Sequence, residues 1–173
     1  MIDVCSANGF LTRGEDTVLS NWVSDEDLDR FSRVKNSHRL LVMGSKTYEA
    51  IRPKPQSERL RVVLTSRPQD FLQDMVPGQL EFTGQEPVAL VSDLEARGYT
   101  SLLLLGGGLV NAAFLAAGLV DELDLTIEPV LFGSGTPFIA TAELETKLQL
   151  LSVEKLNERG TLLLHYRVNK STA

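Results

Sequence analysis

The sequence is poor in the side chains that build disulfides and metal centres. Cys5 is the only cysteine among 173 residues, and the two histidines, His38 and His165, lie far apart along the chain. A single cysteine excludes an internal disulfide and fits a reducing compartment. Because thiolate and imidazole ligands are so scarce, the sequence predicts no metal site.

The sequence also lacks a long hydrophobic run and an excess of positive charge. Its apolar runs, such as residues 102–105, which end at three glycines, are far too short to cross a bilayer. No basic stretch followed by an apolar run opens the chain, so we expect no signal peptide. A net charge of −6 repels phosphate backbones, which argues against nucleic acid and membranes as partners. We therefore expect a cytoplasmic protein.

What the chain does have is the composition of an ordinary globular domain. Hydrophobic residues make up 43% and charged residues 23% of the sequence, and both values argue against disorder. A chain of 173 residues suits one hydrophobic core. Residues 1–173 are therefore expected to form a single domain.

Segments with strand and helix character alternate along the sequence. Short apolar runs predict strands, and they lie at residues 1–5, 39–43, 60–64, 101–105 and 122–127. Helices are expected between them, at residues 24–35, 45–51, 86–97 and 109–117. Residues 148–156 and 161–168 flank a turn sequence and predict an antiparallel hairpin. This order predicts a three-layer α/β fold with a mixed, mostly parallel central sheet flanked by helices and a C-terminal antiparallel hairpin.

Three of the predicted strands end in glycine or small polar residues. Gly106–Gly108 and Gly44–Thr47 each connect a strand to a helix, where backbone amides, hydroxyls and a lysine suit a phosphate. The competing interpretation is a tight turn and a plain helix start. Ser66 and Arg67 follow a third strand and suit the 2′-phosphate that separates NADPH from NADH, although surface arginines are common before a turn proline. Together these turns favour a dinucleotide.

The helix expected from Ser24 carries three acidic residues in its first turn. Asp25 and Glu26 are expected to face solvent. Asp27 lies three residues after Ser24, which would allow it to close a capping box. Asp27 also lies on the same side of the helix as Phe31, where its carboxylate could point into an apolar pocket and hold a protonated heterocycle. The helix alone leaves both roles open.

Several of these stretches resemble dihydrofolate reductase nearly from end to end. Residues 42–51, VMGSKTYEAI, resemble its V-M-G-R-x-T-x-E-S-I segment, and residues 52–59 resemble the stretch whose last arginine holds the folate glutamate. Residues 62–67 resemble the strand and turn that meet the 2′-phosphate. Leu105–Gly108 resembles the I-G-G-G turn, in which a cis Gly-Gly peptide lies against the cofactor.

Other stretches resemble the pyrimidine reductase domain of riboflavin synthesis. These are residues 6–9, 20–22, 118–123 and 128–135. The chain also departs from dihydrofolate reductase, because Ser45 replaces a phosphate-binding arginine and Asn111 stands where a tyrosine lies near the nicotinamide. The joint presence of Asp27, Thr126 and Arg59 favours folate over the pyrimidine.

The resemblance implies NADPH-dependent reduction of 7,8-dihydrofolate to tetrahydrofolate. It makes Asp27, oriented by Thr126, the acid that favours substrate protonation, with Trp22 beside them as a third catalytic residue or a core anchor. The implied substrate-binding residues are Cys5, Ala7, Leu28, Phe31, Ile51, Arg59 and Leu105. The implied cofactor-binding residues are Ala7, Gly44, Ser45, Lys46, Thr47, Leu64, Thr65, Ser66, Arg67, Leu105, Gly106, Gly107, Gly108, Leu109, Val110 and Asn111.

Two other functions remain open at this point. One is the riboflavin-pathway reductase, which acts on a ribosylamino-pyrimidine phosphate and would need basic groups for that phosphate. The other is a NADP-binding protein without turnover. In each case the partner is a small molecule, and the protein is expected to be a monomer or a homodimer.

Overall fold

The computed structural model describes residues 1–16, 18, 21–140 and 144–170. Its elements run in the order β1 (Ile2–Ser6), α1 (Asp25–Ser37), β2 (Leu40–Gly44), α2 (Ser45–Ile51), β3 (Leu60–Leu64), the 3₁₀ helix η2 (Pro68–Phe71), β4 (Leu80–Thr83), α3 (Pro87–Ala96), β5 (Leu103–Leu104), α4 (Gly108–Ala116), β6 (Glu122–Glu128), β7 (Leu148–Lys155) and β8 (Leu162–Val168). No helix among these described residues is both long and apolar enough to cross a membrane.

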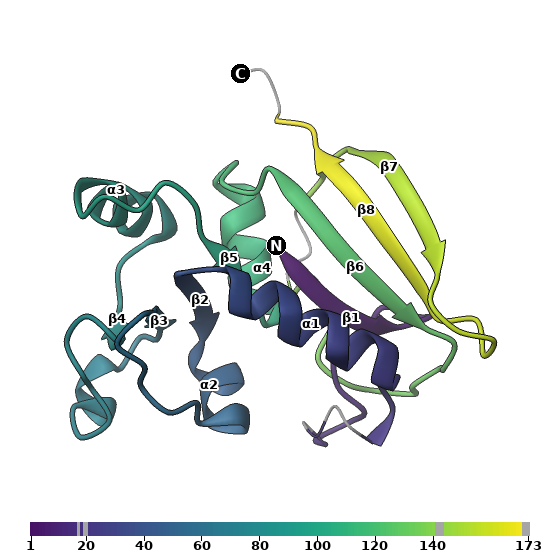
Figure 1. Cartoon of the computed structure of the whole chain (residues 1–173), viewed down its shortest axis with the longest axis horizontal. Helices are drawn as coiled ribbons and strands as arrows, with labels where there is room; N and C mark the ends of the chain where they lie inside the picture. Colours follow the sequence, from purple (N-terminus) through teal and green to yellow (C-terminus); the bar gives the residue numbers. More distant parts are fainter. Residues whose placement is uncertain (17, 19–20, 141–143, 171–173) are drawn as a thin grey trace.

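The strands form two four-stranded sheets that lie next to each other in Figure 1. In the order β4-β3-β2-β5, every pair of neighbours is parallel. In the order β1-β6-β8-β7, the first pair is parallel and the other two are antiparallel. The predicted α/β class, with parallel strands flanked by helices and a C-terminal hairpin, is confirmed.

The predicted single central sheet needs one correction. β5 is only two residues long and pairs with β2 on one side, so among the described residues no strand ladder joins it to β1. Side chains connect the two sheets instead, because Ile2 of β1 packs in one buried cluster with Leu41 of β2 and Leu103 of β5.

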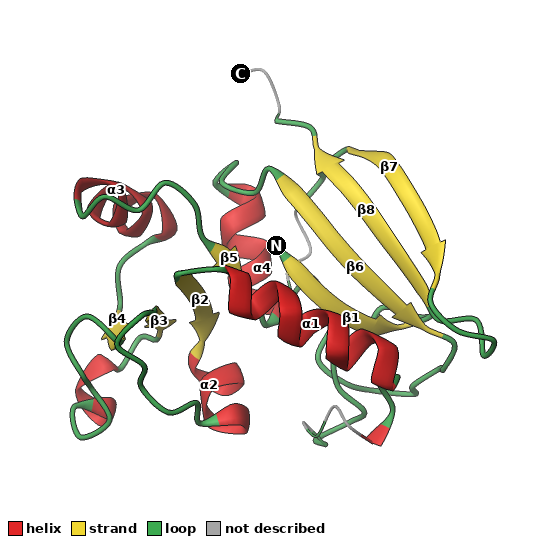
Figure 2. Cartoon of the chain, viewed as in Figure 1, coloured by secondary structure: helices red, strands yellow, loops and turns green. Residues whose placement is uncertain are grey.

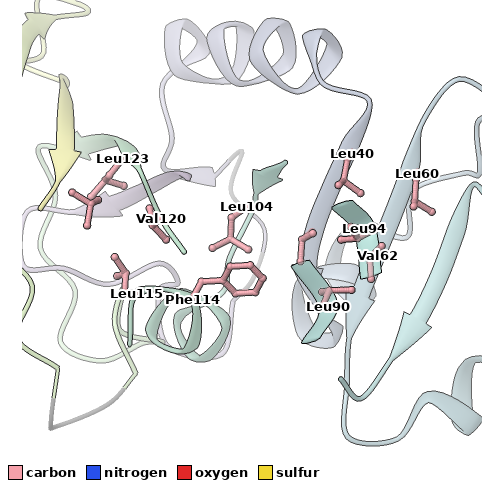
Figure 3. Packing of buried hydrophobic residues seen from close by; sticks show 12 residues of the cluster. Leu40, Leu60, Val62, Leu90, Leu94, Leu104, Phe114, Leu115, Val120 and Leu123 are labelled. Carbon is pink, nitrogen blue, oxygen red and sulfur yellow. The ribbon is translucent and has the colours of Figure 1, made fainter. Parts of the chain in front are cut away.

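The burial of β2 shows that helices cover this strand on both faces, which makes three layers. Its residues Leu40 to Met43 are at most 2% exposed, as expected for a strand covered on both faces. Alternate side chains point to opposite faces. Leu40 and Val42 join the cluster formed with α3 and α4, which Figure 3 shows around Leu90, Leu94 and Phe114. Leu41 and Met43 join the cluster on the face covered by α1.

The hairpin at the end of the chain is less covered. β7 is the edge strand, and all eight of its residues are exposed. Figure 2 shows β7 and β8 extending beyond the helices that cover the rest of the molecule. Their predicted pairing as an antiparallel hairpin is confirmed.

Candidate functional site

A cavity of about 920 Å³ opens where the parallel strands end. Its walls come from the ends of β2, β3 and β5, the starts of α2 and α4, and part of β1. Most of the predicted cofactor-binding residues line it, namely Gly44, Ser45, Lys46, Thr47, Leu64, Thr65, Ser66, Arg67, Leu105, Gly107, Gly108, Leu109 and Val110. The three predicted strand-end turns therefore meet at one site.

Backbone atoms of other segments lie close to the glycine turn, Gly106–Gly108. The peptide between Gly106 and Gly107 is cis, as the resemblance implied, and Gly106 has a φ of +75°. A Cβ atom on Gly108 would lie 2.1 Å from the carbonyl oxygen of Pro137, so no larger residue fits. Gly44 donates its N–H to the carbonyl oxygen of Gly106 at 2.8 Å. This bond fixes two walls of the cavity relative to each other.

One part of the cavity fits phosphate groups. Lys46 and Arg67 supply positive charge, while Ser45, Thr47 and Ser66 supply hydroxyls. The Arg67 side chain is 73% exposed and lies 3.4 Å from an Asp70 carboxylate oxygen, an exposed pair that a phosphate can displace. Together with a cradle of glycine backbone, these donors fit the pyrophosphate and 2′-phosphate of NADPH.

Asp27 and Thr126 form a buried pair beside this cavity. The Thr126 hydroxyl donates to Asp27 Oδ1 at 2.5 Å, and the two side chains are 0% and 4% exposed. Desolvation raises the pKa of Asp27, while the Thr126 hydrogen bond and the charge of Arg30 lower it. Thr126 lies opposite Val4, a wall residue of the cavity, in the β1–β6 register. Neither Asp27 nor Thr126 is among the residues that line the cavity.

Asp27 is not the capping residue of α1. Ser24 occupies the N-cap position, but its side chain makes no capping hydrogen bond. Glu128, which the sequence analysis missed, takes that role, because its Oε1 accepts the Ser24 N–H at 2.7 Å. Its Oε2 accepts the Thr161 hydroxyl at 2.7 Å. A long-range carboxylate thus replaces the predicted local cap and leaves Asp27 free for another role.

Trp22 lies in the core next to this pair. It is 8% exposed and packs edge-on against Phe132, with 5.1 Å between ring centroids. Val4 and Leu28 pack against the same cluster, so Trp22 is a core anchor. Its Nε1 and the Ser24 hydroxyl are buried and have no hydrogen-bond partner among the described residues.

Arg59 is placed differently from its expected role. It is 8% exposed, and its guanidinium donates to the carbonyl oxygens of His38 at 3.0 Å and Asn36 at 3.2 Å. It also donates to Gln56 Oε1 at 3.3 Å. Arg59 does not line the cavity. Because these donors are used to hold the segments before β2 and β3, the structure gives no support to a substrate-carboxylate role.

The remaining predicted substrate residues are divided between the cavity and the core. Ile51 and Leu105 line the cavity. Leu28 packs with the Trp22 cluster, and Phe31 packs with the cluster under α1. Cys5 is 4% exposed, and desolvation raises its thiol pKa to about 11, which agrees with a small buried hydrophobe.

Ala7 and Asn111 do not line the cavity. Ala7 is exposed, and its N–H donates to the Val130 carbonyl oxygen at 2.8 Å. Asn111 is 0% exposed and lies behind the glycine turn, where it donates to Asp3 Oδ2 at 2.9 Å and to the Phe138 carbonyl oxygen at 3.0 Å. Direct contact between Asn111 and a cofactor is therefore not supported.

Asp3 is a cavity residue that the sequence analysis missed. It lines the cavity next to Val4 and Leu105. The available signal was a charged residue inside the apolar strand β1. Within the described ranges, no group of three or more His, Cys, Asp or Glu side chains is placed to hold a metal ion.

Comparisons with known proteins agree on one family. The family model of the RibD C-terminal domain matches residues 5–162. The uncharacterized protein YwjB of Bacillus subtilis is 25% identical over 130 residues, covering 73% of this chain and 71% of that protein.

Solved structures share the fold. A pyrimidine reductase-like protein from Corynebacterium diphtheriae has a TM-score of 0.80 at 18% identity and covers 98% of this chain and 91% of its own. A putative riboflavin biosynthesis protein from Shewanella sp. PV-4 has a TM-score of 0.77 at 21% identity and covers 97% of both chains. A deaminase and 5-amino-6-(5-phosphoribosylamino)uracil reductase from Thermotoga maritima has a TM-score of 0.75 at 16% identity, and the match covers 97% of this chain but 55% of that one.

The family match decides between the two resemblances seen in the sequence. It favours the riboflavin-pathway family, and dihydrofolate reductase is not supported. Since the match spans 158 residues, from 5 to 162, the chain belongs to the RibD C-terminal domain family.

Proposed function

We propose that this protein is an NADPH-dependent reductase acting on a ribosylamino-pyrimidine phosphate of riboflavin synthesis. Pyrimidine reductases of this family use NADPH. The observation that carries the proposal is the 920 Å³ cavity, where the glycine turn, Lys46 and Arg67 meet within one chain of that family.

A neighbouring cavity adds polar side chains beside the larger one. It has a volume of about 570 Å³ and shares Thr12, Lys46 and Thr136 with the larger cavity. Ser134 adds a further hydroxyl to its wall. The hydroxyls suit a sugar and Lys46 attracts a phosphate, but Glu15 and Glu49 line the same cavity and repel a phosphate.

The roles of the protein residues follow from these positions. When bound, NADPH supplies a hydride from its nicotinamide ring. The cavity walls orient the reactants and exclude water. Reduction of a double bond also requires a proton, and we assign its supply to Asp27, a buried carboxyl group whose pKa is raised by desolvation. Thr126 holds this carboxyl group in one orientation.

A spectrophotometric assay of NADPH oxidation tests the proposal. The purified protein is given the ribosylamino-pyrimidine phosphate or dihydrofolate in parallel reactions. We expect turnover with the pyrimidine and none with dihydrofolate. Turnover with dihydrofolate alone would restore the folate function. Saturable NADPH binding without turnover of either substrate would indicate a NADP-binding protein that is not an enzyme.

A further inference from the structure

Asp3 is a carboxylate that the proposed reaction does not yet use. It lines the cavity from β1, and its Oδ2 accepts the Asn111 amide at 2.9 Å. The second hydrogen of that amide goes to the Phe138 carbonyl oxygen, so the amide is held at both ends. A Cβ atom on Gly106 would lie 3.0 Å from Asp3 Oδ1. The carboxylate is therefore fixed directly against the glycine turn.

The other carboxylate oxygen, Oδ1, belongs to a side chain that lines the cavity. No residue that the structure describes forms a hydrogen bond to Asp3 Oδ1, and this atom keeps some accessible surface. Asp3 is half-buried, and a carboxylate partly withdrawn from solvent is costly unless something compensates its charge. A ligand with a positive or electron-poor group next to Asp3 would supply that compensation.

The distribution of charge around the cavity fixes the orientation of a dinucleotide. Lys46 and Arg67 are positive, whereas Asp3 on β1 and Glu86 at the start of α3 are acidic. The phosphates of NADPH are repelled by Asp3 and attracted by the two cations. The nicotinamide end carries no negative charge, so it is the end that lies toward Asp3. This ring is neutral when reduced and positively charged when oxidised.

We propose that the Asp3 carboxylate, held by Asn111 against the glycine turn, faces the nicotinamide end of the cofactor and favours its oxidised form. This inference rests on the proposed function. The hydride carries two electrons to the substrate, and the positive charge that remains is stabilised by Asp3 through space. Asp3 forms no covalent bond and transfers no proton in this role.

The charged groups around Asp3 agree with this role. Burial raises the pKa of Asp3 to about 7, while the Asn111 hydrogen bond and the amino group of Met1 lower it. The Cys5 thiol also interacts with Asp3, but its own pKa of about 11 keeps it neutral. The carboxylates of Asp121, Glu122 and Asp124 act on the same amino group. A neighbouring positive ring would favour the ionised state of Asp3.

Binding of the two cofactor forms provides the test. Dissociation constants for NADP⁺ and NADPH are measured by calorimetry for the wild type, Asp3→Asn and Asp121→Asn. The asparagine at position 3 can still accept the Asn111 hydrogen bond, so the fold should persist. We expect Asp3→Asn to weaken NADP⁺ about tenfold and NADPH less than about twofold. Asp121, whose side chain is 77% exposed outside the cavity, should change neither constant.

The outcomes separate this inference from the proposed function. An unchanged ratio of the two constants in Asp3→Asn, with both forms still bound, would overturn the role of Asp3 and leave the reductase function intact. Failure of the wild type to bind either form would overturn both. If Asp3→Asn does not fold, the wild-type ratio is measured from about pH 5.5 to 8.5. NADP⁺ must then gain affinity relative to NADPH as the pH rises, and a flat ratio would contradict the inference.

Discussion

Asp27 combines deep burial with a hydrogen bond that fixes its carboxyl group. Since burial raises its pKa, the folded protein binds the Asp27 proton more tightly than the unfolded chain does. Ionisation of Asp27 therefore costs stability as the pH rises above the pKa of the unfolded chain, and it costs nothing below that value. The Asp27 carboxyl group therefore lowers the stability of the fold at high pH, although the proposed reaction requires it.

Replacing Asp27 should separate its effect on stability from its effect on activity. We expect Asp27→Asn to be as stable as the wild type, or more stable by about 1 kcal/mol at pH 8, because the amide carries no charge. Turnover should fall about 100-fold, since the amide cannot donate an acidic proton. Urea unfolding and the NADPH assay measure the two effects. Asp29→Asn, at an exposed position on the same helix, is the control. Full activity of Asp27→Asn would show that another group supplies the proton.

Arg67 is the residue expected to select between the two cofactors. Arg67→Ala should weaken NADPH binding by about 1–3 kcal/mol, the usual contribution of a charged hydrogen bond, while NADH binding barely changes. Dissociation constants from NAD(P)H fluorescence measure this difference. Arg167→Ala, at an exposed position on β8, controls for the loss of one positive charge. Equal losses for both cofactors would mean that Arg67 does not contact the 2′-phosphate.

Arg59 should matter for stability and not for substrate affinity. Because its buried guanidinium holds carbonyl groups of Asn36 and His38, Arg59→Ala leaves these acceptors unpaired. We expect unfolding to become easier by about 2–4 kcal/mol, measured in urea. The Michaelis constant should stay near the wild-type value. Arg52→Ala, with a side chain that is 64% exposed, should change neither property. A raised Michaelis constant with unchanged stability would return Arg59 to the substrate site.

At the scale of whole elements, Glu128 ties the end of β6 to the start of α1 and to Thr161 near the hairpin turn. Glu128→Ala removes both carboxylate oxygens. The buried Ser24 N–H and the Thr161 hydroxyl are then left without their acceptors. We expect a loss of about 2–4 kcal/mol in the free energy of unfolding. Glu122→Ala, at an exposed position on the same strand, should cost little. If both variants unfold at the same urea concentration, Glu128 does not anchor these elements.

The elements that the sequence predicted well are those with strong local signals. The predicted bounds of α2 and β3 agree with the structure, because Gly44 and Pro53 bracket the first and polar residues flank the mostly apolar second. β4 was missed because only Leu80 and Phe82 of its four residues are buried against β3. The 3₁₀ helix η2 has no apolar periodicity and was missed as well.

The same distinction applies to the site. The strand-end turns carry their function in consecutive residues, so the sequence located them. Asp3 and Glu128 act through partners that are 108 and 104 residues away, at Asn111 and Ser24. Arg59 was assigned to substrate because its position in the chain resembles a known motif. Its burial, in contact with Asn36 and His38 at the end of α1, could not be predicted from that motif.

At the scale of the whole molecule, the cavity is shared by the two sheets. Asp3 and Val4 come from one sheet, whereas Gly44 and Leu64 come from the other. The clusters of buried side chains also cross this boundary, since Ile2 packs against Leu41. A ligand that fills the cavity therefore contacts both sheets and should stabilise them together.

Thermal unfolding with and without NADPH tests whether the chain behaves as one cooperative unit. We expect a single transition that moves upward as a whole when NADPH is added. At a concentration of about 100 times the dissociation constant, linkage contributes about 2.7 kcal/mol, which corresponds to a shift of about 5–10 °C for a domain of this size. NADH at the same concentration, which lacks the 2′-phosphate, should give a smaller shift. Two transitions, with only one of them moved by NADPH, would show that the sheets unfold independently and that the cavity belongs to one of them.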